Sequence, residues 1–251
     1  LKISCSEGTS QIRQKTRMAA KQELYDSLDK LQADGKYEDV LTMCNKALEE
    51  ESEDKEVLWR LARGYFDMAD NAVDNPKQKE GFIRDGLKTA EKLMGIDDSN
   101  WLAHKWYAIV LSGLGPYQSM TDKIKDAHKI KEHGMRALEL HPKGGDATTN
   151  HLLGRWCSSV TSVSWLERKA AAALFGTPPE SSHDEALGYY LKADQLDASL
   201  RNTLCIGDSY FAKKDYTQAK EAYQRCIDWP DAGTPFAKTL VAEASTKIKK
   251  C

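Results

Sequence analysis

The residues with the chemistry for catalysis or metal binding are histidines and cysteines, and their spacing limits what they can do. His128 and His133 are five residues apart, so on a helix they do not share a face as metal ligands at i and i+4 would. His151 and Cys157 are the types of a nucleophile and its base. The sequence contains no HExxH, no phosphate-binding glycine loop and no GxSxG motif. We therefore expect no catalytic residue, no metal site and no cofactor.

Composition and charge narrow the class of protein. Of 251 residues, 41% are hydrophobic and 29% are charged, which is typical of a soluble globular chain and excludes low-complexity disorder. The net charge of −2 lacks the basic field of a dedicated nucleic-acid-binding protein. Six scattered cysteines without a CxxC pair fit a reducing cytosol. No apolar run approaches the roughly 20 residues of a membrane span.

Internal repetition is the strongest pattern in the sequence. Residues 39–48 place apolar side chains at i, i+3, i+4, i+7 and i+8, which predicts a helix with one buried face. The spacing of residues 35–48 recurs at 214–227. A different spacing recurs at 58–65, 104–111, 150–157 and 203–210: a large apolar residue is followed directly by Gly or Ala and, three positions later, by Tyr in two of the four segments and by Leu or Cys in the others. Both spacings are typical of tetratricopeptide repeats.

The same alignment explains residues that otherwise look reactive. Cys157 occupies the position that Tyr65 and Tyr210 hold in sister repeats, which favours packing over catalysis. Gly154 and Gly207 stand where two helices must approach closely.

Pairing the two kinds of helix predicts the architecture. Five hairpins are expected, at residues 18–50, 54–97, 100–141, 147–197 and 200–228. Residues 236–250 are expected to form a polar capping helix. The sequence therefore predicts an all-α, tetratricopeptide-like solenoid forming one domain over residues 18–251. Residues 1–17 lack apolar periodicity and are expected to be a flexible segment, either a native linker or a cloning remnant.

Three hairpins are longer than the repeat of about 34 residues. The excess is expected as insertions at residues 69–82, 114–126 and 158–182. The tryptophans beside the repeat core, together with Trp165, are expected to pack these insertions onto the solenoid.

The first helix of each hairpin lines the concave face of such a solenoid. Opposite the buried positions, the residues predicted to face this groove are Trp59, Arg63, Phe66, Lys105, Ile109, His151, Arg155, Leu204, Asp208 and Phe211. Arg63, Lys105 and Arg155 form a basic row suited to a carboxylate-rich peptide or an anionic head group. A solvated helix face with unremarkable charges explains the row equally well.

A second basic stretch lies outside the predicted groove. Residues 123–143 contain three acidic residues and six basic ones, which are Lys123, Lys125, Lys129, Lys131, Arg136 and Lys143. An excess of positive charge would attract an acidic polymer such as a tubulin tail. Lysine-rich stretches are, however, usually solvated surface.

Beyond the repeats, several stretches resemble one family. They are HKWYA at 104–108, HPK at 141–143, LLGRWC at 152–157, SWLERK at 164–169 and ALFGTPP at 173–179. No generic helical repeat requires WLERK or LFGTPP. From about residue 24 to 228 the chain resembles the regulator of microtubule dynamics family. The resemblance implies a non-enzymatic cytosolic protein that associates with microtubules, spindles and spindle poles and aids chromosome segregation. Some relatives carry an N-terminal membrane anchor, with lipid proposed as cargo.

Three functions follow as hypotheses. The first is a cytoplasmic, cytoskeletal protein whose basic residues bind tubulin, with no nucleic-acid partner. The second is a lipid-binding or lipid-transfer module, which needs an enclosed cavity of a few hundred cubic ångströms for a phospholipid. The third is an adaptor whose groove binds an acidic peptide of another protein.

Overall fold

The computed structural model describes residues 3–164, 168–169, 172–173, 179–230 and 232–251. Within these ranges the regular structure is entirely helical. The α-helices are α1 (Ile3–Ala33), α2 (Tyr37–Glu50), α3 (Lys55–Asn71), α4 (Pro76–Ile96), α5 (Trp101–Gly113), α6 (Met120–Leu140), α7 (Ala147–Thr161), α9 (His183–Leu196), α10 (Leu200–Ala212), α11 (Tyr216–Ile227) and α12 (Pro235–Lys247). Short 3₁₀ turns lie at Gly115–Tyr117 and Ile248–Lys250.

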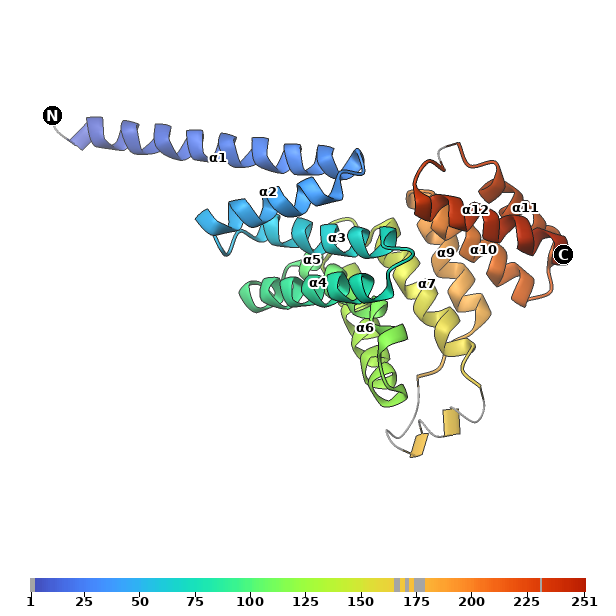
Figure 1. Ribbon diagram of the computed structural model, residues 1–251. Coiled ribbons are helices and arrows are strands. Elements are labelled where there is room, and N and C mark those ends of the chain that lie inside the picture. The colour runs from blue at the N-terminus through green and yellow to red at the C-terminus, as the bar shows by residue number, and fades with distance from the viewer. Residues whose placement is uncertain (1–2, 165–167, 170–171, 174–178, 231) are drawn as a thin grey trace.

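Consecutive helices pack as antiparallel hairpins. The pairs are α1 with α2, α3 with α4, α5 with α6, α7 with α9, and α10 with α11, and each hairpin packs on the next. Helix α12 lies against α10 and α11 at the C-terminal end of the stack (Figure 1). The prediction of an all-α, tetratricopeptide-like solenoid with a capping helix is therefore confirmed.

Side-chain caps set where the helices begin. At most N-termini a short polar side chain accepts a hydrogen bond from an amide of the first turn, which satisfies a backbone donor that the helix leaves free. These capping residues are Asp54, Asn75, Asn100, Ser119, Asp146, Ser182, Ser199, Asp215 and Thr234. The hairpin register predicted from apolar spacing is thus supported by local polar chemistry.

Close contacts between glycine and tyrosine hold the C-terminal hairpins together. Tyr190 of α9 and Tyr223 of α11 are buried, and their rings lie against Gly154 of α7 and Gly207 of α10. A Cβ atom on either glycine would lie 2.6 Å from ring carbons, closer than van der Waals contact allows. The expected role of these glycines in close helix packing is confirmed.

Two of the expected insertions lengthen helices. Helices α4 and α6 have 21 residues each, whereas α2 has 14 and α11 has 12. The segment 114–126 also contains the 3₁₀ turn before α6. The third insertion, at 158–182, begins within α7, and much of it, Trp165 included, lies outside the described residues.

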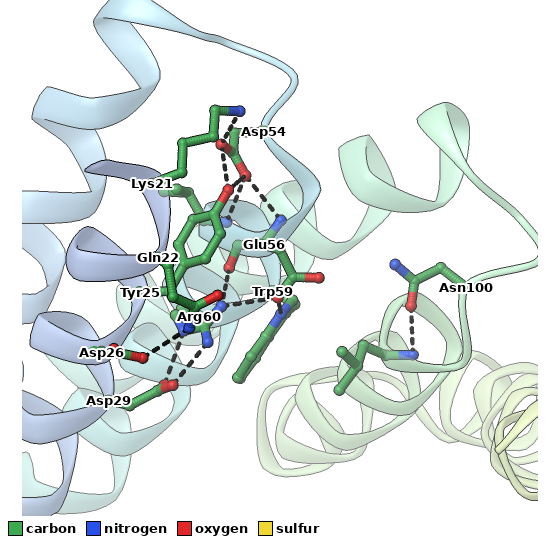
Figure 2. A network of polar contacts seen from close by, with 12 residues as sticks. Lys21, Gln22, Tyr25, Asp26, Asp29, Asp54, Glu56, Trp59, Arg60 and Asn100 are labelled. Carbon is green, nitrogen blue, oxygen red and sulfur yellow. Dashed lines mark hydrogen bonds and ion pairs between the residues drawn. The ribbon is translucent and has the colours of Figure 1, made fainter. Parts of the chain in front are cut away.

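Helix α1 is fastened to the α2–α3 turn by the polar network of Figure 2. The Asp54 carboxylate accepts hydrogen bonds from Lys21 at 2.8 Å and from the Tyr25 hydroxyl at 2.8 Å, while Arg60 pairs with Asp29 at 2.7 Å. Residues 3–17, expected to be flexible, have helical backbone and extend α1 away from the other helices (Figure 1). Division of the chain into residues 1–17 and a domain at 18–251 remains a prediction.

Substitution of the packed glycine tests the close approach of α7 and α9. We expect Gly154→Ala to destabilise the fold by about 1–3 kcal/mol because the methyl group forces Tyr190 aside. Gly188→Ala, on α9 with open space around it, should instead stabilise by about 0.5–1 kcal/mol through helix propensity. Urea unfolding of both variants checks this, and a shift of the same sign in both would contradict it.

Candidate functional site

The concave side of the solenoid contains a cavity of about 600 Å³. Helices α3, α5, α7 and α10 contribute most of its wall. Four aromatic side chains, Trp59, Phe66, Trp101 and Trp106, supply much of the lining. Glu56 accepts a hydrogen bond from the Trp59 indole at 2.9 Å, and Arg60 lies over the Trp59 ring at 4.1 Å, so the network of Figure 2 positions this part of the wall.

Most of the residues predicted to face the groove lie together at this cavity. Those that line it are Trp59, Arg63, Phe66, Lys105, Ile109, His151 and Arg155. Leu204 and Phe211 are not among the residues that line it. Leu204 is buried in the C-terminal core, and the Phe211 ring centre lies 5.4 Å from that of Tyr216. Asp208 lines a neighbouring cavity of about 290 Å³ and pairs with Lys247 at 2.7 Å. Binding of a partner at these residues remains a prediction.

The expected basic row is largely neutralised within the protein. Lys105 is buried, and its ammonium pairs with Asp146 at 2.7 Å. Burial lowers the pKa of Lys105. Burial alone would raise the pKa of Asp146, but the ion pair with Lys105 outweighs this effect and holds the pKa of the carboxyl below its usual value. Arg63 lies 3.6 Å from Asp67. Because a buried charge left without its partner destabilises the fold, charge reversal at Lys105 is not a clean probe of binding.

Arg155 differs from the other two cations of the row. It is exposed on α7, and its side chain has no hydrogen bond or ion pair within the described part of the chain. It also lines three cavities, of about 270, 600 and 290 Å³. Arg155 is therefore the member of the row that is available to an anionic group.

Sequence reasoning missed two charged residues that also line the cavity, Arg201 and Asp70. Arg201 of α10 forms an ion pair with Asp70 of α3. The Arg201 guanidinium lies 4.3 Å from the Phe236 ring centre and 5.8 Å from that of Phe66. The spacing of the predicted α10 stripe, continued one turn toward the N-terminus from Leu204, reaches Arg201 and could have found it.

His151 is a neutral member of the wall whose ring is largely enclosed. Its Nδ1 lies 2.9 Å from Asn202 Oδ1, and the Asn202 amide nitrogen donates to the Tyr190 carbonyl. Oδ1 must therefore accept, which places the imidazole proton on Nδ1 and leaves Nε2 an acceptor without a partner in the described structure. Burial lowers the pKa of His151 to about 3.

The basic residues predicted outside the groove spread over α6 and the turn after it. Lys131 is drawn inward, with its ammonium 4.4 Å from the Trp156 ring centre. The exposed remainder is called the α6 basic surface and consists of Lys123, Lys125, Lys129, Arg136 and Lys143. Lys129 and Arg136 pair with acidic residues of the same helix, at 3.6 and 3.1 Å. Lys123, Lys125 and Lys143 have no ion pair with any described residue.

The residues considered for catalysis are occupied in packing. Cys157 is buried, and burial raises the pKa of its thiol, while His151 is held by Asn202. Among the described residues, no group of three or more His, Cys, Asp or Glu side chains could hold a metal ion. The histidine pair that does meet is His104 with His133, whose Nδ1 atoms lie 2.7 Å apart. None of the described helices is long and apolar enough to cross a bilayer.

The hairpin stack and its hollow concave face define a helical-repeat protein of the tetratricopeptide type. A tetratricopeptide-repeat protein of Thermus thermophilus has the same fold, with a TM-score of 0.62 over 90% of this chain and 98% of that one, at 15% identity.

Sequence similarity places the chain within this class. The family model described as Regulator of microtubule dynamics protein 1-3 matches residues 24–250. Regulator of microtubule dynamics protein 1 of Bos taurus is 35% identical over 91% of this chain and 71% of its own length. The Homo sapiens protein of the same name is 36% identical over 74% of this chain and 59% of its own length. Regulator of microtubule dynamics protein 3 of Xenopus laevis is 42% identical over 57% of this chain and 30% of its own length. The chain belongs to the regulator of microtubule dynamics family.

Acid should weaken the fold through His151. The pKa of His151 in the folded protein, about 3, lies below the ordinary 6.5, so the unfolded state binds the proton more readily. The contribution of neutral His151 to the free energy of unfolding is therefore fully present above pH 6.5 and is lost as the pH falls below that value. From pH 7 to pH 5 the loss should be about 2 kcal/mol. His151→Gln keeps a donor for Asn202 without titrating.

Urea unfolding of both proteins at the two pH values measures this loss. Other titrating groups are common to both, so the free energy of unfolding of wild type should fall by about 2 kcal/mol more than that of the variant. Parallel pH dependences would show that His151 is not held neutral.

Proposed function

We propose that this chain regulates microtubule dynamics by binding the microtubule directly, through the α6 basic surface. The observation that carries the proposal is the exposure of Lys123, Lys125 and Lys143 without ion pairs to described residues, whereas two of the three cations of the predicted basic row are paired internally. Membership of the regulator of microtubule dynamics family supports it. The protein would act without catalysis, in the cytoplasm and on the cytoskeleton.

The physical basis is attraction between lysines and the acidic tails of tubulin. Exposed charges interact over about one Debye length, near 10 Å at 0.1 M salt, so the contact should weaken steeply as salt is added. Binding of this kind places the protein on spindle microtubules and at spindle poles, where it would aid chromosome segregation.

Co-sedimentation with taxol-stabilised microtubules over a salt titration tests the proposal. We expect saturable pelleting at low salt that is lost as salt rises. Replacing Lys123, Lys125 and Lys143 together by Glu should weaken pelleting by about tenfold or more, because three attractive charges become repulsive.

The control replaces three exposed lysines on α4 and α11, Lys77, Lys92 and Lys220, which also have no ion pair with a described residue. It changes the net charge equally but leaves the α6 basic surface intact. If both triple variants lose pelleting equally, net charge and not the α6 basic surface accounts for the loss. If wild type does not pellet at low salt, direct binding is refuted.

A second candidate function uses the concave cavity as a lipid-binding site. Its volume of about 600 Å³ lies in the range of small-molecule sites, and its aromatic wall offers apolar surface. Native mass spectrometry of the purified chain should then show a bound phospholipid. Replacing Trp59 and Ile109 by polar residues should abolish that mass, and a chain that carries no lipid after incubation with phospholipid vesicles would exclude this function.

A further inference from the structure

The contact between α3 and the C-terminal helices is unusual for a solenoid. In a linear repeat array each hairpin touches its neighbours in sequence. Here Arg201 pairs with Asp70, 131 residues away, and α12 also contacts α3 (Figure 1). The contact between Arg201, Asp70, Phe66 and Phe236 is called the clasp. It joins the second hairpin to the fifth and to the capping helix, and three of its four residues, Phe66, Asp70 and Arg201, line the cavity.

Asp70 sits at an electrostatically poor position for a carboxylate. It lies in the last turn of α3, where the helix dipole disfavours negative charge. Asp67 lies one turn earlier, half-buried, with its pKa raised to about 6, chiefly by burial and further by the charge of Asp70. Arg201 offsets this repulsion. Because Asp70 carries its charge at an unfavourable position, a carboxylate of a ligand can compete with it for the same guanidinium.

Two guanidinium groups face the same part of the cavity. Arg155 and Arg201 both line it, and the charges of both act on His151. Arg155 is free of described partners and Arg201 is held by Asp70. Once the clasp opens, the site therefore offers two cations beside the aromatic side chains Trp59 and Phe66.

We propose that the clasp is an autoinhibitory contact and that an acidic peptide binds the cavity by displacing Asp70 from Arg201. One peptide carboxylate takes Arg155 and a second takes Arg201, each through charge-assisted hydrogen bonds. The peptide backbone and apolar side chains lie on the aromatic wall. A peptide fits the site because one extended chain carries two separate carboxylates together with apolar side chains. Arg155 and Lys123 of the α6 basic surface both line the cavity of about 270 Å³, but the two proposals are tested with different ligands and different substitutions, so either can fail alone.

Fluorescence anisotropy with a labelled peptide of alternating glutamate and tyrosine tests the proposal. A matched peptide of alternating glutamine and tyrosine is the control, because its affinity measures the part of binding that does not depend on the carboxylates. Wild type should bind the acidic peptide, and Asp70→Asn should bind it about three- to tenfold more tightly because Arg201 no longer has an internal competitor. Arg155→Gln and Arg201→Gln should each weaken binding by about tenfold or more.

The control variant is Arg225→Gln, which breaks an exposed ion pair with Asp194 on the outer helices and should leave the affinity unchanged. Exchanging the clasp charges, in Asp70→Arg with Arg201→Asp, keeps an ion pair between α3 and α10 but moves the cation onto α3. This double variant loses the contact of the Arg201 guanidinium with the Phe236 ring, so it should be slightly less stable than wild type, and it should bind the peptide about tenfold more weakly or not at all.

Several outcomes would overturn the inference. If Asp70→Asn binds the acidic peptide no more tightly than wild type, the clasp does not inhibit. If Arg155→Gln binds as wild type does, the peptide lies elsewhere. If the peptide fails to bind while anionic phospholipid vesicles bind in an Arg155-dependent way, the occupant is a lipid. Small-angle scattering gives an independent measure, since the radius of gyration of Asp70→Asn should exceed that of wild type.

Discussion

The fold depends on how closely two helices can approach within and between hairpins. Tyr190 and Tyr223 fill the space that Gly154 and Gly207 leave open, and each contact fixes the distance between the two helices of one hairpin. A small rotation from each hairpin to the next accumulates along the chain as curvature. Curvature then brings α3 and α10, which are remote in sequence, into the wall of one cavity. The charged and aromatic wall of that cavity is therefore a product of packing between small and large side chains at a distance from it.

Charge on the concave face is organised so that buried ions have partners. Lys105 lies beneath tryptophan rings and faces Asp146, and the remaining acidic and basic groups of the wall largely match. A buried ion without a partner would be strongly destabilising, so a cation in such a wall is more often a structural element than a contact for a ligand. Arg155 can remain unpaired with described residues because it is exposed to water. On the outer surface, hydration likewise stabilises Lys123, Lys125 and Lys143 without an ion pair to a described residue.

The sequence predicted the hairpins well because apolar spacing and capping side chains act over a few residues. It also placed Trp59, His151 and Arg155 on one face, since the repeat register fixes which stripe of each first helix is concave. It could not show that Lys105 is neutralised or that Arg201 reaches α3, because those partners are 41 and 131 residues away. Nor could it anticipate that two insertions would lengthen α4 and α6, since added polar turns carry no strong apolar signal.

The clasp also bears on how the molecule loses its structure. In an open array of repeats the terminal units can fray while the middle stays folded, because each unit is stabilised only by its neighbours. The ion pair between Arg201 and Asp70 adds a direct interaction between the second hairpin and the C-terminal end, which are not neighbours in sequence. Fraying of the last hairpin then also removes a contact from α3, so the second hairpin and the C-terminal end of the stack should unfold together.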